Sequence, residues 1–299
     1  MLDKKYYLGI DGGGTKTAFA IIDENNELIY FNEQGASSLD TVSLSTVKEV
    51  FIEGTKGFNY KVDSVFVGLG GIANDNQIKE VIDIVRELPI CKETTKIDAG
   101  NDVVNALYGS LGGLDGLMII AGTGSVCFGK NKDKVARAGG YCYQEGDAGS
   151  SYDLGYKALQ HLARVIDYRY EETEFSLDLK KVTNCYDYAS LASYFINANR
   201  TQIASLSRVV TRHQLDKYAQ KIIINAVDEI LLMIKSVYNQ LDFQNEEVYF
   251  SIIGSLGNAD TLYKNYLLKN LKNISLNIKY IEKKYEAYIG SALKAKELK

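Results

Sequence analysis

The first part of the chain alternates short apolar runs with tight breaks. Three apolar runs are separated by the turn sequences GGG and DENN, and they occupy residues 7–10, 18–22 and 28–31. Short runs bounded by turn-forming residues are typical of β-strands joined by tight turns. This pattern predicts a β-meander. The spacing of the next apolar positions predicts a helix over 42–58, a buried strand over 65–69, and helices over 78–88 and 102–111.

The pattern then restarts. The sequence LMIIAGTGSVCF at 117–128 echoes LGIDGGGTKTAF at 8–19. Such weak internal repetition predicts two domains that each open with a hairpin hinged at glycine. After Asp147 the spacing becomes mostly helical. It predicts helices over 154–165, 188–197, 203–210 and 215–241, a strand over 248–253 and a closing helix over 287–298.

The chain offers no long linker or low-complexity segment, and we place the domain boundary near Gly112 and Gly113. The expected N-terminal domain covers residues 1–113, and the expected C-terminal domain covers 114–285. The closing helix, within 286–299, is expected to pack on the N-terminal domain.

Composition narrows the function classes. With 34 basic and 38 acidic residues the formal net charge is -4, and no basic stripe is visible, so nucleic acid is not an expected partner. The cysteines form no Cys-x-x-Cys pair, which argues against a zinc site or a disulfide framework. The apolar stretch 222–237 is broken by charged residues and predicts an amphipathic helix rather than a membrane span. We expect a soluble, cytoplasmic protein.

The segment GIDGGGTKT at 9–17 resembles two common phosphate motifs without matching either. A P-loop needs Lys directly after the last glycine, but Thr15 stands between Gly14 and Lys16. A dinucleotide fingerprint needs a third glycine and a following helix, whereas both glycine turns lack that glycine and are followed by β-branched and aromatic residues. The remaining interpretation is a hairpin whose turn faces a phosphate.

In that interpretation each residue of the turn has a use. Glycine lets backbone N–H groups approach phosphate oxygens. Asp11 can hold Mg²⁺, and Thr15, Lys16 and Thr17 add hydroxyl and ammonium donors. The alternative is an ordinary glycine hairpin with an exposed lysine. The second turn, Gly122-Thr123-Gly124-Ser125, favours the phosphate interpretation, because a triphosphate is commonly held from two sides.

These segments resemble the phosphate motifs of the actin/hexokinase/heat-shock-70 ATPases, and more narrowly those of the BadF/BadG/BcrA/BcrD group, which contains N-acetylglucosamine kinases. Residues 252–255 (IIGS) are similar to the adenosine motif and 290–292 (GSA) to the start of the closing helix. The resemblance covers residues 8 to about 295. It implies an α/β fold of two ribonuclease-H-like domains with ATP, Mg²⁺ and substrate in the cleft between them. It implies nucleotide contacts at Gly12, Gly13, Gly14, Thr15, Lys16, Thr17, Gly122, Thr123, Gly124, Ser125, Gly254 and Ser255.

The candidate for the catalytic base is Asp102. It lies in the segment NDVVNAL, which is similar to the family's Asn-Asp-Ala-x-x-Ala-Leu segment, whose aspartate is the proposed base. A position at a helix N-terminus favours the ionised form that a base requires. The alternative is that Asn101 or Asp102 only caps the helix, which is a common use of both residue types. Asp98 is a nearby carboxylate that has to be excluded.

The segment GGYCYQEGDAGS at 139–150 resembles the family's amino-sugar pocket. Asp147 is the candidate acceptor for sugar hydroxyls, and Glu145 adds a carboxylate where many relatives are apolar, although a solvated loop is the alternative. Ser38 stands where relatives often have asparagine, and Gly71 belongs to a loop near the substrate. With Asn101 these residues form the expected sugar site. Several positions depart from the family pattern, so the identity of the sugar is left open. These positions are Ser38, Cys142, Tyr143, Glu145 and Ala148.

The resemblance therefore implies an ATP-dependent kinase of a small amino sugar. N-acetylglucosamine is the first candidate and N-acetylmuramic acid the second, with transfer to the 6-hydroxyl. Relatives are commonly dimers, so a homodimer is expected. Two alternatives remain: an ATP-hydrolysing activator of an acyl-CoA dehydratase or reductase, and a non-catalytic sugar sensor. The first would need cysteines for an iron–sulfur cluster, and the second would not need Asp11, Lys16 and Asp102 together.

Overall fold

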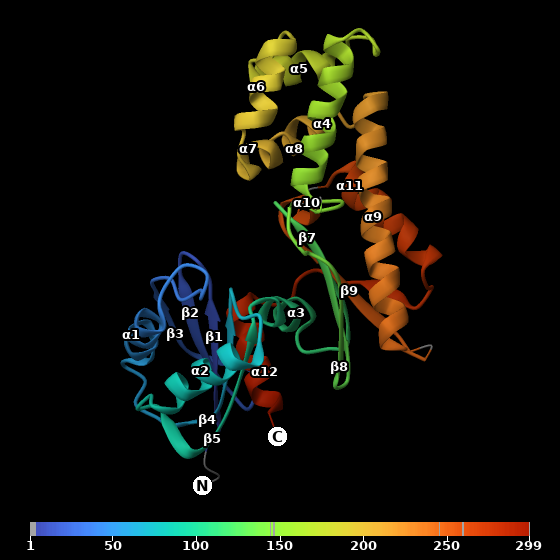
Figure 1. Ribbon diagram of the computed structural model, residues 1–299. Coiled ribbons are helices and arrows are strands. Elements are labelled where there is room, and N and C mark those ends of the chain that lie inside the picture. The colour runs from blue at the N-terminus through green and yellow to red at the C-terminus, as the bar shows by residue number, and fades with distance from the viewer. Residues whose placement is uncertain (1–3, 144, 146, 245, 259, 299) are drawn as a thin grey trace. The chain divides into compact units, whose positions relative to one another are not determined.

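A computed structural model gives the structure of the protein and describes residues 4–143, 145, 147–244, 246–258 and 260–298. The chain divides into two units (Figure 1). Unit 1 contains Met1–Leu114 and Glu282–Lys299, and unit 2 contains Asp115–Ile281. Unit 1 is thus built from both ends of the chain.

Unit 1 joins a mixed sheet to helices on both of its faces. Its elements are β1 (Tyr6–Gly12), β2 (Thr17–Asp23), β3 (Leu28–Gln34), α1 (Leu44–Thr55), β4 (Val62–Leu69), α2 (Asp75–Arg86), β5 (Cys91–Asn101), α3 (Val103–Leu111) and α12 (Ala287–Glu297). The sheet order is β3-β2-β1-β4-β5. The first three strands pair antiparallel, as the predicted meander requires, and β4 and β5 add in parallel.

The alternation of side chains along β1 separates two apolar layers. Leu8 and Ile10 belong to a buried cluster that includes Phe51 of α1 and Val81 of α2. Tyr7, which points to the opposite face, packs against a cluster formed by residues of β2, α3 and α12. Helices therefore cover both faces of the sheet, and the end of β1 lies between two packed layers (Figure 1).

Unit 2 contains the second sheet and most of the helices. Its elements are β6 (Gly116–Ala121), β7 (Ser125–Asn131), β8 (Lys134–Gly139), α4 (Ser151–Ile166), α5 (Glu174–Thr183), α6 (Tyr188–Asn197), α7 (Arg200–Ser205), α8 (Ser207–Arg212), α9 (Lys217–Leu241), β9 (Val248–Ile253), α10 (Ser255–Asn258), α11 (Leu262–Asn270), η1 (Leu271–Asn273) and β10 (Ile278–Tyr280). The long helix α9 runs from the helical layer of α4–α8 down along the sheet (Figure 1).

The two sheets share one topology. In unit 2 the order is β10-β9-β6-β7-β8, with β6, β7 and β8 antiparallel and β9 and β10 parallel. Strand β6 thus corresponds to β1, β7 to β2, and β9 to β4. The glycine turn between β6 and β7 corresponds to the turn between β1 and β2, which confirms the hairpin repetition that the sequence predicted.

Several elements were not predicted. Among them are strands β8 and β10 and helices α5 and α11. The short strands β8 and β10 are held by pairing with β7 and β9, which a local pattern does not encode. The helix predicted over 203–210 is two short helices. The first begins at Arg200, because the Asn199 side chain accepts from Gln202 N and caps the helix. The second follows Leu206, whose N–H donates a hydrogen bond to Ile203 O (3.1 Å).

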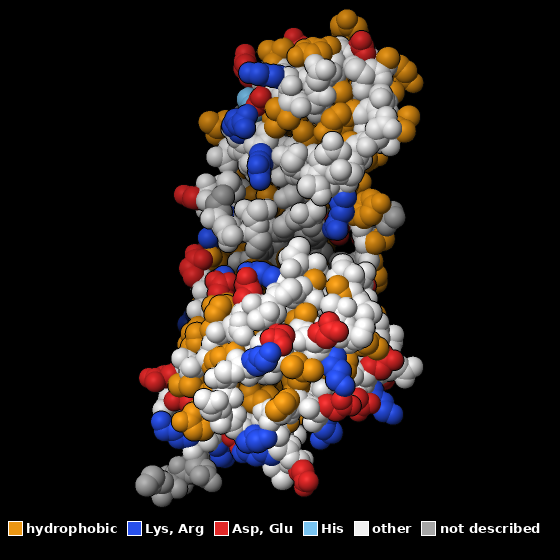
Figure 2. All heavy atoms as spheres, turned by 90° about the vertical axis from the view of Figure 1, so that its left-hand side faces the viewer, with side chains coloured by type: hydrophobic (Ala, Val, Ile, Leu, Met, Phe, Trp, Pro, Cys, Tyr) orange, Lys and Arg blue, Asp and Glu red, His pale blue; other side chains and the backbone are white. Residues whose placement is uncertain are grey.

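Charged side chains of both signs are interspersed over the face shown in Figure 2. Such mixing is typical of a solvated surface. Within the described ranges, no helix combines the length and apolar character that a membrane crossing needs.

The C-terminal helix α12 is joined to β1 and α3 at close range. The Ser291 hydroxyl lies 2.9 Å from Phe66 O and 3.1 Å from Ile10 O, so it connects α12 to β4 and β1. A side chain at Gly290 would overlap the Gly109 backbone of α3, with its Cβ 2.8 Å from Gly109 Cα. The close approach of α12 to α3 therefore depends on glycine at position 290.

We predict that Gly290→Ala lowers the free energy of unfolding by about 1–3 kcal/mol, because the added methyl group forces α12 away from α3. Gly290→Val is expected to cost more. Thermal melts and hydrogen exchange of the unit 1 amides measure the effect. Gly35→Ala is the matched control, since a Cβ there meets no atom within 4 Å. Equal melting temperatures for Gly290→Ala and the control would contradict the prediction.

Candidate active site

The turn between β1 and β2 is closed by backbone hydrogen bonds. The Gly13 N–H donates to Lys16 O (2.9 Å), and Gly13 O accepts from the N–H groups of Ser37 and Ser38 (3.1 Å each). Gly14, next along the turn, is exposed. The turn is tied down at its base and open at its tip. Backbone N–H groups in such a turn can bind a phosphate.

The predicted donor side chains of this turn divide into two groups. Thr15 and Lys16 are exposed, and Lys16 Nζ lies 2.7 Å from the Glu33 carboxylate. Thr17 is fully buried, and its hydroxyl lies 2.7 Å from Ser37 Oγ. Thr15 and Lys16 can therefore reach a ligand, while Thr17 supports the turn from inside.

Asp11 ends strand β1 beside the turn. Its Oδ1 accepts a hydrogen bond from Asn105 Nδ2 (2.7 Å). Burial raises the pKa of Asp11 to about 6; the Asn105 hydrogen bond and the charge of Lys16 lower the pKa, and the charge of Asp102 raises it. A half-buried carboxylate whose anionic form is under-stabilised is well suited to bind a cation.

Asp11 also fits the way in which proteins hold Mg²⁺ with a nucleotide. Among the described residues, no group of three or more His, Cys, Asp or Glu side chains could hold a metal ion. Mg²⁺ needs no such group, because it is commonly bound by one or two carboxylates together with phosphate oxygens and water. The residues present are therefore compatible with Mg²⁺ that arrives with a nucleotide.

Asp102 stands at the start of helix α3, but its carboxylate makes no capping hydrogen bond. Asn101 Oδ1 instead accepts from Val103 N (3.2 Å). Burial raises the pKa of Asp102; nearby backbone N–H groups lower the pKa, and the charge of Asp40 raises it. Asn101 therefore binds the backbone at the start of the helix, and the Asp102 carboxylate faces a cavity.

This cavity brings several predicted residues together. It lies within unit 1, and its volume is about 310 Å³. Its lining joins the candidate base, the candidate metal ligand and the first glycine turn, and adds residues near the start of α12 that the sequence did not single out. The lining residues are Asp11, Gly12, Gly13, Thr15, Lys16, Ala18, Glu33, Asp102, Glu286, Ala287 and Tyr288.

The predicted sugar residues of unit 1 gather around a pair of glycines. A Cβ at Gly70 would lie 2.9 Å from Ser38 Oγ and 3.6 Å from Asp102 Oδ2. A Cβ at Gly71, where φ is 84°, would lie 2.7 Å from Asp40 N. Glycine at both positions therefore leaves room for the Ser38 and Asp40 side chains close to Asp102, and neither glycine lines the cavity that Asp102 faces. Asp40 is a residue that sequence reasoning missed, although it lies two positions after Ser38.

The second glycine turn, between β6 and β7, is fixed to the start of helix α4. Gly122 N donates to Gly124 O (3.0 Å), and Ser151 N donates to Gly122 O (2.8 Å). The buried Ser125 hydroxyl donates to Ala148 O (2.6 Å). As in the first turn, the hydroxyl residue at the start of the second strand supports the turn from inside.

The predicted adenosine motif lies next to this turn. Gly254 has φ 99°, and a Cβ there would lie 2.5 Å from Ala121 O, so glycine permits the close approach of the two strand ends. Thr123 and Ser255 line one cavity of about 320 Å³. The remaining lining is rich in hydroxyl groups. Among the residues that the structure describes, the buried Thr261 hydroxyl has no hydrogen-bond partner. Residues missed by the sequence are Thr201, Ser205, Ser207, Arg208, Thr211 and Thr261.

The structure describes only part of the predicted sugar-binding segment of unit 2. Glu145 is exposed, and its neighbours Gln144 and Gly146 lie outside the described residues. Asp147 is buried at a positive φ of 43°, and its Oδ2 lies 2.5 Å from Arg200 Nη2. Sequence reasoning missed Arg200, because no motif connects it with Asp147.

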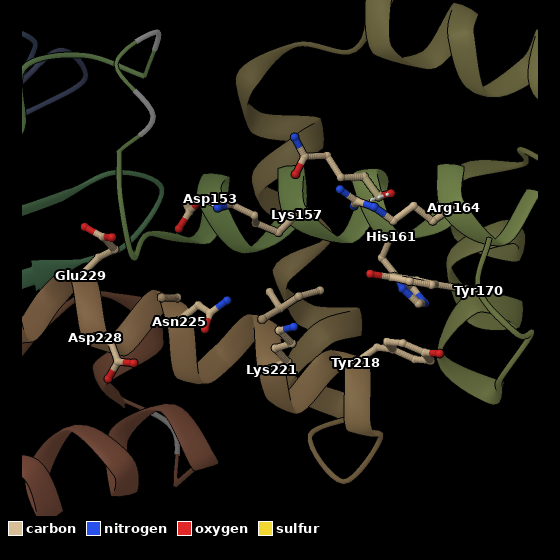
Figure 3. A pocket seen from close by; sticks show the side chains of 13 residues that line it. Asp153, Lys157, His161, Arg164, Tyr170, Tyr218, Lys221, Asn225, Asp228 and Glu229 are labelled. Atoms are coloured by element: carbon tan, nitrogen blue, oxygen red, sulfur yellow. Dashed lines mark hydrogen bonds and ion pairs between the residues drawn. The ribbon is translucent and has the colours of Figure 1, made fainter. Parts of the chain in front are cut away.

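A larger cavity, of about 570 Å³, lies between α4 and α9 (Figure 3). Charged side chains of both signs project into it, among them Lys157 and Lys221. His161 at its wall is buried and stacks on Phe175, and burial lowers its pKa to about 4. None of the predicted site residues lines this cavity.

Comparison with known sequences gives a family match over almost the whole chain. The sequence profile of the BadF/BadG/BcrA/BcrD ATPase family matches residues 8–295. The N-acetylmuramic acid/N-acetylglucosamine kinase of Clostridium acetobutylicum is 30% identical, with 98% of each chain covered. The N-acetyl-D-glucosamine kinase of Dictyostelium discoideum is 27% identical, also with 98% of each chain covered.

Solved structures share the fold. A Chromobacterium violaceum protein assigned as an N-acetylglucosamine kinase superposes with a TM-score of 0.69 at 19% identity, covering 97% of this chain and 98% of that chain. A glucokinase of the ROK family from Streptomyces griseus, solved with glucose and AMPPNP, gives a TM-score of 0.57 at 14% identity, covering 98% and 99%. These matches confirm the predicted actin-like α/β fold.

We predict that Asp11→Asn stabilises the ligand-free protein at pH 8. Because the folded-state pKa is raised to about 6, the stability that a protonated Asp11 provides is fully present below pH 3.8 and is lost as pH rises through 6. The amide oxygen of asparagine can keep the Asn105 hydrogen bond. The expected gain at pH 8 is about 1–3 kcal/mol and disappears near pH 4. Melts from pH 4 to 8 without nucleotide or Mg²⁺ test this, and a variant less stable than wild type at pH 8 would refute it.

Proposed function

Because the chain belongs to the BadF/BadG/BcrA/BcrD ATPase family, we propose that it is an ATP-dependent kinase that phosphorylates an N-acetylhexosamine. The enzyme class is that of both curated relatives, which are named as amino-sugar kinases. The observation that carries the proposal is the cavity of unit 1, where Asp102, Asp11 and the first glycine turn line one space. A base, a cation ligand and a phosphate turn in one cavity are the parts that phosphoryl transfer to a hydroxyl requires.

The proposed nucleotide contacts are divided between the units. In unit 1 they are Gly12, Gly13, Gly14, Thr15 and Lys16, with Thr17 supporting the turn. In unit 2 they are Gly122, Thr123, Gly124 and Ser125 for phosphate, and Gly254 and Ser255 for the nucleoside. The cavity of about 320 Å³ beside Ser255 supports the nucleoside assignment. Mg²⁺ held by Asp11 would offset phosphate charge.

Asp102 is the proposed base. A sugar hydroxyl oxygen forms a bond to the γ-phosphorus as the bond from that phosphorus to the β-phosphate oxygen breaks, and the hydroxyl proton passes to Asp102. The products are ADP and the phosphorylated sugar. A loose transition state needs only a weak base, so a carboxylate is sufficient. The position of Asp102 beside both Asp11 and Gly70 supports this role.

The proposed sugar contacts are Ser38, Gly71 and Asn101 in unit 1 and Glu145 and Asp147 in unit 2. We propose N-acetylglucosamine as the first substrate and N-acetylmuramic acid as the second, with transfer to the primary 6-hydroxyl. The names of the two curated relatives support this order of candidates. Asp40 belongs with this group, because its carboxylate lies against Gly71 next to Asp102.

A screen of ATP consumption tests the substrate class. We predict that N-acetylglucosamine or N-acetylmuramic acid gives a kcat/KM about tenfold or more above those of glucose and glucosamine, because the acetamido group adds binding contacts. A coupled assay for ADP with N-acetylmannosamine as a further acceptor measures it. Turnover with none of these sugars would rule out the amino-sugar proposal.

We predict that Asp102→Asn removes transfer while sugar and nucleotide still bind. The amide keeps the size of the side chain but cannot accept the proton, so kcat is expected to fall about 10²–10⁴-fold with little change in KM. Asp98→Asn, a change in strand β5 outside the cavity, is the matched control. Near wild-type kcat in Asp102→Asn would mean that Asp102 is not the base.

A further inference from the structure

Arg200 is a charged residue of unit 2 that neither motif nor comparison assigns. It is the first residue of α7, and a capping box between Asn199 and Gln202 fixes the start of that helix. The Asn199 side chain accepts from Gln202 N (2.9 Å), and Gln202 Oε1 accepts from Asn199 N (2.8 Å). The backbone that carries Arg200 is therefore held in place before the side chain makes any contact.

The guanidinium group reaches the second glycine turn. A Cβ placed on Gly124 would lie 2.6 Å from Arg200 Nη2 and 2.9 Å from Asp147 Oδ2. The lack of a side chain at Gly124 is thus what lets the guanidinium lie against the turn backbone. Arg200 Cζ also lies over the ring of Tyr143, 5.6 Å from the ring centroid. The turn and the segment that carries Tyr143 and Asp147 therefore both contact the guanidinium.

The ion pair between Arg200 and Asp147 is uneven in its exposure. The Arg200 side chain is 41% exposed, whereas that of Asp147 is 4% exposed. A molecule that reaches this turn therefore meets more of the cation than of the carboxylate. A guanidinium has five N–H donors in a planar fork, and the hydrogen bond to Asp147 uses one nitrogen, Nη2. The fork geometry matches phosphate oxygens.

We infer that Arg200 binds a nucleotide phosphate beyond the α-phosphate at the turn formed by Gly122, Thr123, Gly124 and Ser125, and that Asp147 positions its guanidinium. This assignment rests on the proposed function, which gives the turn its phosphate. It also gives Asp147 a second use beside sugar binding. The buried carboxylate holds the fork in one orientation, so little side-chain entropy is lost when phosphate binds.

Binding of Mg²⁺ complexes of ATP and ADP, and of AMP, to the full chain tests the inference. We expect Arg200→Gln to weaken ATP and ADP binding about ten- to hundredfold, because the neutral amide cannot make the charge-assisted hydrogen bonds of a guanidinium. AMP binding is expected to change less than twofold. Arg200→Lys keeps the charge but loses the fork, so it should fall between wild type and Arg200→Gln.

Arg212→Gln is the matched control. Arg212 ends helix α8 and pairs with Asp178 (2.8 Å), so the variant also removes an arginine–aspartate pair from a short helix of unit 2. Its nucleotide binding should equal that of wild type. In Asp147→Asn the arginine remains but loses its anchor, and ATP binding should weaken severalfold. If Arg200→Gln does not fold, Arg200→Lys and Asp147→Asn test the inference in its place.

The outcomes separate the two proposals. Wild-type protein that binds none of the nucleotides refutes the proposed function. Wild-type protein that binds ATP, with Arg200→Gln and Arg200→Lys unchanged or weakened equally for AMP and ATP, overturns the assignment of Arg200 alone. A raised KM for the sugar with unchanged ATP affinity would likewise overturn it, because the arginine would then recognise the acceptor.

Discussion

Backbone-to-backbone contact between α12, β1 and α3 is the constraint on which the site in unit 1 depends. Gly9 faces backbone atoms of α12, Gly290 faces those of α3, and Gly109 faces the backbone just before α12, so these segments meet without intervening side chains. The Ser291 hydroxyl and the Asn105 amide both reach the carbonyl oxygen of Ile10, one residue before Asp11. The position of Asp11 and of the glycine turn after it is thus set by helices that follow much later in the chain.

Unit 2 has the same topology, and there other residues permit the close approach of neighbouring backbones. Strand β6 corresponds to β1, and its end approaches Gly254 after β9, where a side chain would meet Ala121 O. In both units a glycine turn joins the first two strands, and a buried hydroxyl, Thr17 or Ser125, supports it from below. A hydroxyl side chain suits this place because it can bond to backbone or side-chain oxygens without bringing a charge into the interior.

Much of this could be predicted from sequence, and the limits have physical causes. The meander and the second hairpin that begins near residue 117 could be predicted, because strand length and glycine breaks are local signals. Asp11, Asp102 and the first turn were found from motifs, and the structure places them around one cavity. Asp40 and Arg200 were not found, since their roles depend on contacts with Gly71 and Gly124 that no local pattern encodes. Thr17 was expected among the ligand donors, but its hydroxyl is bonded inside the turn.

Unit 1 is made of the first 114 residues together with the last 18, from Glu282 to Lys299. During synthesis the sheet of unit 1 leaves the ribosome long before α12 does, and the apolar side chains that α12 covers, Ile22 and Tyr108 among them, stay uncovered while unit 2 is made. Domains generally fold as units in the order in which they emerge. Here the reverse order follows: unit 2 has all its residues available first, and the N-terminal unit completes its core only after the last helix is released.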